Sequence, residues 1–231
     1  MNFPRDNQRH TIYGKTGSGK TVAGLWALEK RSWDKIPWII LDIKRDQTIA
    51  QIPRLEEIDI ERAPPKQRGL YVTRPVPQSD DHIDRFLWDV WKRGNIGLMV
   101  DEGYMINRFS KPWQAVLTQG RSLRIPVITL TQRPSWVSPF LMSETDYHQA
   151  FFLQAPADVD KLAEWNVPVP PHQDYSSWYY DVPKNLWTRL APVPDEQEIL
   201  DRFDRKMPRR IRMLHGLASN VPRRRRALTI A

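Results

Sequence analysis

Gly14-Lys15-Thr16-Gly17-Ser18-Gly19-Lys20-Thr21 matches the phosphate-loop pattern G-x-x-x-x-G-K-[ST] at every fixed position. The glycines let the backbone curl, so that successive N–H groups can point inward at the β-phosphate of a nucleotide. A helix that begins at the end of the loop adds the positive end of its dipole. In such a loop the lysine, Lys20, reaches the β- and γ-phosphates, and the hydroxyl of Thr21 is a ligand for Mg²⁺. All eight residues are therefore expected to bind ATP together with Mg²⁺.

The first two-thirds of the chain alternates short β-rich runs with helical patterns. This alternation is typical of a mainly parallel sheet flanked by helices. Six prolines between Pro168 and Pro194 argue against a regular helix in that segment. Strands are predicted at residues 9–13, 38–41, 69–73, 96–100, 127–130 and 150–153, and helices at 21–31, 80–93, 113–123 and 195–206.

The strand predicted at residues 96–100 runs directly into an acidic pair, Asp101-Glu102. A carboxylate at Asp101 can hold the water shell of Mg²⁺, and Glu102 is placed to orient and deprotonate an attacking water. Adjacent aspartate and glutamate favour the ATPase branch that has a dedicated base over simple kinases and small GTPases. The predicted fold class is therefore α/β, a RecA-like ASCE P-loop NTPase, with an irregular C-terminal extension rich in proline and aromatic residues.

Thr131-Gln132-Arg133-Pro134 follows the strand predicted at residues 127–130. In the expected sheet this strand lies between the strand that enters the phosphate loop and the strand that ends at Asp101. A polar side chain at its end would sit beside the γ-phosphate, so Gln132 is predicted to sense the loss of that phosphate. The alternative is an ordinary polar turn that a proline ends.

Composition excludes several classes of chemistry. The 231 residues contain no cysteine, which excludes disulfides, thiolate catalysis and cysteine-based zinc sites. The five histidines are scattered without ligand spacing, so no structural metal site is predicted. No apolar run approaches the roughly 18 residues that a membrane-spanning helix needs, so no membrane segment is predicted.

Positive charge gathers at the C-terminal end. The chain has a net charge of +8, and from Arg202 onward it carries ten basic residues and one acidic residue. Three parts are predicted: an ATPase core at 1–165, an extension and helix packing on that core at 166–206, and a basic arm at 207–231. The arm, with Arg223-Arg224-Arg225-Arg226, is either a solvated tail or a contact for nucleic acid, a capsid or a membrane partner.

Taken together, these residues resemble the FtsK/HerA superfamily of DNA-pumping ATPases. The match includes the phosphate loop, Ile39-Ile40-Leu41-Asp42-Ile43-Lys44, Val100-Asp101-Glu102, and Gly120-Arg121 before the segment from Ile125 to Pro134. It covers roughly residues 10–162. In its short length, and in its lack of a membrane helix or a winged helix, the chain is similar to the genome-packaging ATPases of tectivirus-like, membrane-containing phages.

The resemblance implies a homo-hexameric ring around double-stranded DNA, with ATP bound between neighbouring subunits. It also implies packaging of a viral genome into a preformed capsid, with a capsid vertex or portal protein as partner, in the host cytoplasm or on the virion at the packaging vertex. In a ring motor, an arginine of the next subunit stabilises the charge that develops on the transferred phosphoryl group. Arg121 matches the superfamily's arginine, and Arg124 and Arg133 are its rivals.

Two other functions remain open from the sequence. One is a single-stranded DNA exporter or conjugation-type motor, and the other is a soluble P-loop enzyme that does not act on DNA. The loop within Tyr104–Gln119, with Arg108, Phe109 and Lys111, is either a DNA-facing loop or an ordinary surface loop. The aromatic cluster from Tyr175 to Trp187 either stacks on exposed bases or packs on the core or a neighbouring subunit.

Overall fold

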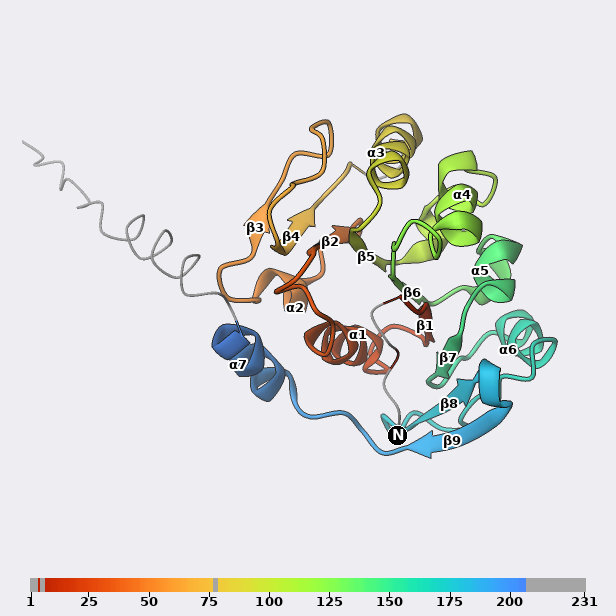
Figure 1. Cartoon of the computed structure of the whole chain (residues 1–231). Helices are drawn as coiled ribbons and strands as arrows, with labels where there is room; N and C mark the ends of the chain where they lie inside the picture. The colour runs from red at the N-terminus through yellow and green to blue at the C-terminus, as the bar shows by residue number, and fades with distance from the viewer. Residues whose placement is uncertain (1–3, 5–6, 77–78, 207–231) are drawn as a thin grey trace, which may run out of the picture.

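A single nine-stranded sheet organises the chain, in the strand order β3-β4-β2-β5-β6-β1-β7-β8-β9. The computed structural model describes residue 4 and residues 7–76 and 79–206 (Figure 1). The strands are β1 (His10–Tyr13), β2 (Pro37–Asp42), β3 (Glu56–Glu57), β4 (Gly69–Thr73), β5 (Gly97–Asp101), β6 (Val127–Thr131), β7 (Tyr147–Ala150), β8 (Ser177–Asp181) and β9 (Leu186–Leu190). The α-helices are α1 (Lys20–Glu29), α2 (Gln47–Ala50), α3 (Asp80–Arg93), α4 (Lys111–Gln119), α5 (Pro139–Ser143), α6 (Pro156–Ala163) and α7 (Glu196–Lys206).

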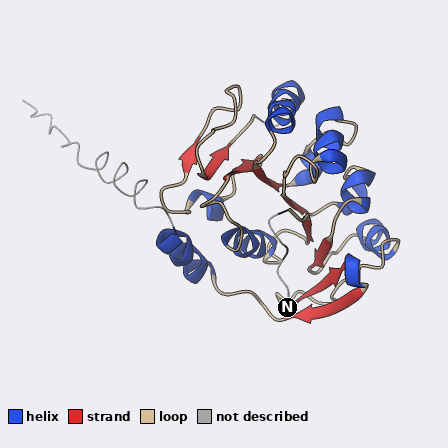
Figure 2. Ribbon diagram, viewed as in Figure 1, coloured by secondary structure: helices blue, strands red, loops and turns tan. Residues whose placement is uncertain are grey.

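Every pairing from β3 to β7 is parallel, and β8 and β9 continue the sheet as antiparallel strands. Helices cover both faces of the sheet (Figure 2). α1, α2 and α7 pack on one face, and α3, α4, α5 and α6 pack on the other. The predicted α/β class, a mainly parallel sheet between two layers of helices, is confirmed. β6 lies between β1 and β5, as the sequence predicted.

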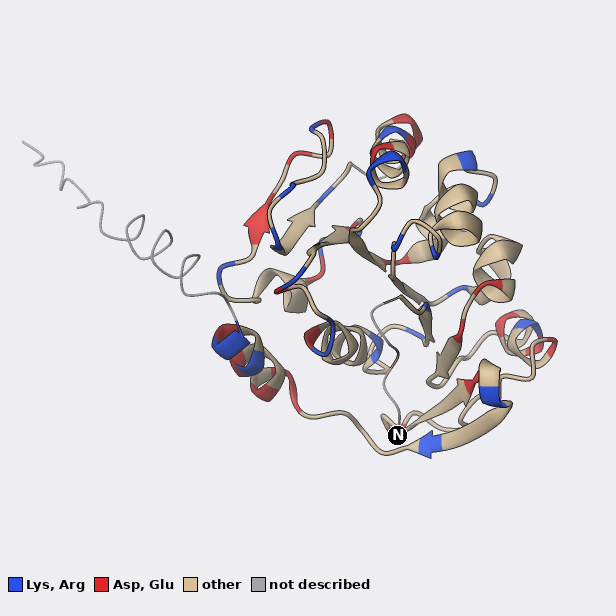
Figure 3. Ribbon diagram, in the orientation of Figure 1, with Lys and Arg blue, Asp and Glu red and all other residues tan. Residues whose placement is uncertain are grey.

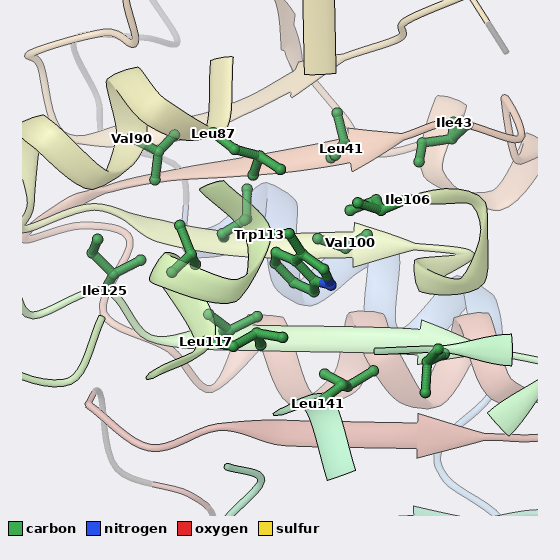
Figure 4. Close-up of a cluster of buried hydrophobic side chains, with 14 of the residues drawn as sticks. Leu41, Ile43, Leu87, Val90, Val100, Ile106, Trp113, Leu117, Ile125 and Leu141 are labelled. Carbon is green, nitrogen blue, oxygen red and sulfur yellow. The ribbon is translucent and has the colours of Figure 1, made fainter. Parts of the chain in front are cut away.

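The hydrophobic core fills the spaces between the sheet and these two layers. Figure 4 shows the larger space, where Leu87 of α3 and Trp113 of α4 face Leu41 and Val100 on the sheet. Each such fully buried side chain contributes roughly 1.5–3 kcal/mol relative to an exposed one. Because β2, β4, β5 and β6 are buried on both faces, they read as nearly continuous apolar runs.

The six strands in the middle of the sheet carry charged side chains only at carboxyl ends, at Asp42 and Asp101. Most other charges lie on the outer helices and loops (Figure 3). In a parallel sheet the carboxyl ends of the strands meet at one edge, which is where ligands bind in open α/β folds. The buried carboxylates therefore mark one edge of the sheet as the candidate site.

Two predicted elements are placed differently by the structure. The strand predicted at 150–153 is wrong, because β7 spans Tyr147–Ala150 and includes the buried polar residues His148 and Gln149. The rest of the apolar run, residues 151–153, follows β7 and lies beside the phosphate loop. The helix predicted at 113–123 is α4, Lys111–Gln119, because the Ser110 side chain accepts a hydrogen bond from the Trp113 N–H at the start of the helix (3.2 Å).

The proline-rich segment forms no α-helix, as its prolines indicated, but the prediction of an irregular extension is wrong, because β8 and β9 add two antiparallel strands to the sheet. Its aromatic rings pack mainly on the sheet, since Tyr179 stacks on Tyr147 with ring centroids 5.4 Å apart. Tyr180 in turn stacks on Trp187 at 4.9 Å. Packing on the core is thus the arrangement found for these three rings of the extension. The boundaries proposed at 165/166 and 206/207 stay predictions, and the basic arm lies outside the described residues.

None of the helices in the described part of the chain combines the length and hydropathy that a membrane span requires.

Replacing Phe203 by alanine tests whether the extension and the core form one cooperative unit. Phe203 of α7 is fully buried and stacks on Trp33, with ring centroids 6.0 Å apart. The variant is expected to lower the free energy of unfolding by about 3–5 kcal/mol in one transition, measured by urea denaturation. Asp201→Ala, on the exposed side of α7, serves as the control and is expected to change it by less than about 0.5 kcal/mol. An unchanged main transition for Phe203→Ala would show that α7 unfolds separately.

Candidate active site

The phosphate loop connects the carboxyl end of β1 to the first turn of α1. Two hydrogen bonds hold the start of the loop, because Gly14 N–H donates to Thr131 O (3.2 Å) and Lys15 N–H donates to Phe152 O (3.1 Å). These bonds tie the loop to the last residue of β6 and to the segment that follows β7. Its position is therefore fixed by the sheet on both sides of β1.

Three glycines allow the loop to curl. Gly17 and Gly19 have φ angles of +78° and +91°, in the left-handed region that favours glycine. A Cβ atom on Gly14 would lie 2.4 Å from Ser18 Oγ, so no larger residue fits there. No side chain among the described residues caps α1. The N–H groups of its first turn are thus free for an anion, and the helix dipole favours one.

Lys20 and Glu102 form a buried ion pair across the site. Lys20 Nζ donates to Glu102 Oε1 over 3.2 Å, and both side chains are almost completely buried. Lys44, which follows β2, lies 3.6 Å from the same oxygen and is partly exposed. Two ammonium groups therefore flank the one carboxylate. The predicted phosphate ligand and the predicted base are in contact, which is the arrangement expected of residues that share a γ-phosphate.

Asp101 is a buried carboxyl group at the carboxyl end of β5. Neither of its side-chain oxygens has one among the described residues, and the residue is fully buried. Burial raises the pKa of Asp101 to about 7, and the nearby Lys20 partly opposes this shift. A buried carboxyl group without partners fits a hydrated cation, which would replace the missing hydrogen bonds.

The hydroxyl of Thr21 completes the set of oxygens that fits Mg²⁺. It donates to Asp46 Oδ2 over 3.5 Å, and Asp46 caps α2 by accepting a hydrogen bond from Thr48 N–H (2.9 Å). Hydroxyl and carboxylate oxygens are the ligands that Mg²⁺ prefers, usually with several waters retained. Thr21 and Asp101 therefore fit the cation that the phosphate loop implies.

Glu102 is one of the residues with a strained backbone. This residue has a φ of +59°, in the left-handed region that glutamate rarely adopts. Gly103 follows, and a Cβ atom there would lie 2.4 Å from Thr129 Cγ2. Strain of this kind persists where surrounding structure enforces it, and it clusters at functional sites. The turn after β5 aims the carboxylate of Glu102 back toward the phosphate loop.

Gln132 bridges the phosphate loop and the turn after Glu102. Its Oε1 accepts a hydrogen bond from Thr16 Oγ1 (2.7 Å), and its Nε2 donates to the hydroxyl of Tyr104 (3.0 Å). The Tyr104 ring also packs edge-on against Trp136, with centroids 5.9 Å apart. A cleft of about 410 Å³ opens beside Gln132; it is lined by Lys15, Gln132, Arg133, Leu153, Gln154, Ala155 and Asp158.

The three candidate arginines lie at opposite edges of the sheet. Arg121 and Arg124 precede the amino end of β6, whereas Arg133 follows its carboxyl end. Arg121 pairs with Asp146, which also accepts a hydrogen bond from Arg9 N–H (2.8 Å). The five residues of β6, at about 3.3 Å each, separate the two edges by about 16 Å. Of these three candidates, Arg133, which pairs with Asp158 at 3.2 Å, lines the same cleft as Lys15 of the phosphate loop.

The structure thus brings together the phosphate loop, Asp101, Glu102 and Gln132, but not Arg121. Sequence reasoning missed Asp46 and Tyr104 as members of the site. One signal for Asp46 was available in the sequence. It follows the Asp42-Ile43-Lys44 segment closely, and aspartate is a residue type that caps helices. Nothing in the sequence pattern pointed to Tyr104 as a partner of Gln132.

This fold and this site define a RecA-like P-loop nucleoside triphosphatase. The DNA packaging ATPase P9 of Enterobacteria phage PRD1 is 40% identical over 217 residues, which cover 88% of this chain and 95% of that protein. The chain belongs to the family of that packaging ATPase, so the predicted resemblance to packaging ATPases of membrane-containing phages is confirmed. No family model matches the chain.

Solved structures support the fold. The genome packaging NTPase B204 from Sulfolobus turreted icosahedral virus 2, in complex with ATP-gammaS, is similar with a TM-score of 0.62 and 16% identity, over 83% of this chain and all of that one. EssC (ATPases 2 and 3) from Geobacillus thermodenitrificans is similar with a TM-score of 0.57 and 14% identity, over 94% of this chain and 45% of that one.

Proposed function

We propose that this chain hydrolyses ATP to drive double-stranded DNA into a preformed viral capsid. The observation that carries the proposal is the contact of Lys20 with Glu102, adjacent to Asp101, on a chain that shares 40% identity with a phage DNA packaging ATPase. The site accounts for ATP hydrolysis, and the family membership supports DNA as the molecule that is moved. A DNA motor needs both the hydrolysis and the DNA substrate.

Binding of ATP would exchange one partner of Lys20 for another. The triphosphate enters between the N–H groups of the phosphate loop and the two ammonium groups of Lys20 and Lys44. Lys20 then turns from Glu102 to the phosphate oxygens, because several negative charges outweigh one. Glu102 is thereby released to accept a proton from the attacking water. Its ion pair with Lys20 would otherwise keep this base occupied.

Thr21 and Asp101 would hold Mg²⁺ beside the phosphates, Thr21 directly and Asp101 through the water shell. When bound, Mg²⁺ neutralises charge on the β- and γ-phosphate oxygens. The high pKa of Asp101 means that the carboxyl group carries a proton for much of the time near neutral pH without the cation. Binding of the cation is expected to release that proton.

Gln132 is proposed to report the state of the γ-phosphate. Its amide contacts Thr16 of the phosphate loop and the Tyr104 hydroxyl at once. Loss of the γ-phosphate would therefore be transmitted to the turn after Glu102, which continues into the loop with Arg108 and Phe109. Phe109 is 73% exposed, and Arg108 lies over its ring. Cationic and exposed, this loop suits a contact with the DNA backbone.

A ring would bring Arg121 to a phosphate loop. Arg121 precedes the amino end of β6, and the length of that strand, about 16 Å, separates this edge from the edge that holds its own phosphate loop, so its proposed action would be on the nucleotide of a neighbouring subunit. Head-to-tail contacts between identical subunits generate a closed ring when the rotation between neighbours closes. We therefore retain the proposal of a homo-hexamer, with a capsid vertex or portal protein as its partner. Its expected place of action is the host cytoplasm during assembly or the packaging vertex of the virion.

The test is ATPase activity of the full chain with long duplex DNA, with single-stranded DNA of equal nucleotide content and without DNA. Duplex DNA is expected to raise kcat severalfold and more than single-stranded DNA does. Light scattering and imaging should find rings under the same conditions. A strict monomer with full activity and no response to DNA would contradict the proposal. Stronger stimulation by single strands would favour an exporter.

A further inference from the structure

A loop from the C-terminal extension touches the phosphate loop. Gln173 Nε2 donates to Gly17 O over 2.7 Å, across a sequence separation of 156 residues. The loop is residues 173–176, between α6 and β8, and is here named the extension loop.

Tyr175, in this loop, is unlike the other tyrosines of the extension. Tyr179 and Tyr180 are buried in the sheet, whereas Tyr175 is 55% exposed. Its ring lies against Gly19, since a Cβ atom on that glycine would be 3.3 Å from Tyr175 Cδ1. Its backbone has a φ of +59°, which costs energy for a tyrosine. A large exposed ring is thus held beside the phosphate loop in a strained conformation.

The extension loop is braced by its own hydrogen bonds. Asp174 Oδ1 accepts from Ser176 N–H (3.0 Å) and from Ser176 Oγ (2.6 Å). Arg189 of β9 donates to Asp174 Oδ2 and to Ser176 Oγ, each over 3.2 Å. The backbone on both sides of Tyr175 is therefore held by hydrogen bonds, and an ordered loop lowers the entropy cost of binding.

The sheet order indicates which part of a nucleotide would meet this ring. Glu102 and Gln132 follow β5 and β6, so the γ-phosphate points to that side of β1. Tyr175 lies by Gly19 together with Phe151, which follows β7 on the other side of β1. The opposite end of the triphosphate carries the ribose and the base. A base on the β7 side would meet an exposed aromatic face.

We propose that the extension loop forms the purine-base end of the nucleotide site, with the ring of Tyr175 stacked on the base. Gln173 ties the loop to Gly17, so the base end and the phosphate end move together. This inference rests on the proposed binding of ATP at the phosphate loop, and not on the packaging of DNA. It gives the C-terminal extension a part in binding the substrate.

The test compares a ligand that has a base with one that lacks it. Calorimetry measures binding of the Mg²⁺ complexes of AMPPCP and of inorganic tripolyphosphate to the full chain. Tyr175→Ala is expected to weaken AMPPCP by about fivefold to a hundredfold, the range that stacking of a base on an aromatic ring gives. It should leave tripolyphosphate within about twofold of the wild type. Tyr175→Phe keeps the ring and should retain AMPPCP affinity.

Phe140→Ala is the matched control, because Phe140 is an exposed aromatic residue of α5 outside the extension loop. It should change neither affinity. Equal weakening of both ligands by Tyr175→Ala would mean that the ring only supports the phosphate loop, and no weakening of either would remove it from the site. Both results overturn the base subsite. Failure of duplex DNA to stimulate the wild type would instead count against packaging alone.

Discussion

Replacing Glu102 by glutamine is expected to lower kcat for ATP hydrolysis by about 10²- to 10⁴-fold, the contribution of a general base. The amide keeps the shape of the side chain but cannot take the proton of the attacking water. The turn after β5 should survive, because its left-handed φ and the tight fit of Gly103 against Thr129 do not depend on the charge. The loss should therefore appear in the rate and not in the fold.

ATP binding by Glu102→Gln should be retained or tightened. Glu102 holds Lys20 at 3.2 Å, with Lys44 at 3.6 Å, and a bound triphosphate would compete for these ammonium groups. Removing the negative charge ends that competition. Single-turnover hydrolysis and calorimetry with ATP measure the two effects separately. Hydrolysis above about a tenth of the wild-type rate would refute the role of Glu102 as the base.

Glu164→Gln is the matched control for this substitution. Glu164 follows α6, pairs with Lys161 at 2.6 Å and is exposed, so the same change of charge there should alter neither rate nor affinity. Lys20→Ala differs from Glu102→Gln in its expected effect on ATP binding, because it removes a phosphate ligand. It should lose binding and hydrolysis together.

The phosphate-loop edge of the site could be predicted from sequence because its parts are local. A loop such as 14–21 sits between a strand and a helix whatever the rest of the chain does. Asp101 and Glu102 come at the end of an apolar run. Because the strands were predicted to be parallel, this position places both residues at the same edge of the sheet as the phosphate loop. The place of β6 between β1 and β5 then brought Gln132 to the phosphate loop.

β7 shows where pattern reading failed. Its residues include His148 and Gln149, both buried, and the strand is stabilised by partners far away in sequence. Tyr13 Oη and His148 Nδ1 are 2.8 Å apart, and Gln149 Nε2 donates to Ser177 Oγ over 2.9 Å. A polar strand with satisfied hydrogen bonds has no apolar alternation to detect. The apolar run just after it was mistaken for the strand.

Contacts between distant segments were also beyond sequence reasoning. The pairing of β8 with β7 and the bond from Gln173 to Gly17 depend on how the chain returns after α6. No local propensity encodes that return. The ion pair of Arg121 with Asp146 is similar, since it joins the amino ends of two strands. The candidate arginine was found by pattern, and its location only by structure.

Arg121→Ala is expected to lower kcat of the assembled protein by about 10³- to 10⁵-fold, the effect of removing an arginine that a neighbour supplies. Because Arg121 lies at the edge opposite its own phosphate loop, the variant should bind ATP with wild-type affinity. Arg62→Ala, a change at an 84% exposed arginine on a surface turn, is the control and should leave both quantities unchanged.

Mixing variants distinguishes a contribution in trans from a structural role. Arg121→Ala subunits have an intact phosphate loop, and Lys20→Ala subunits have an intact Arg121. Each variant alone should be inactive. In a mixed ring, however, the nucleotide bound by an Arg121→Ala subunit can meet the intact Arg121 of a neighbouring Lys20→Ala subunit, so that interface has every catalytic group. Activity should therefore reappear in the mixture. If Arg121→Ala alone keeps its ATPase activity, the assignment fails, and Arg124 or Arg133 becomes the candidate. If the mixture stays inactive while rings form, the role of Arg121 is structural, through its ion pair with Asp146, and it does not act on the neighbour's phosphate.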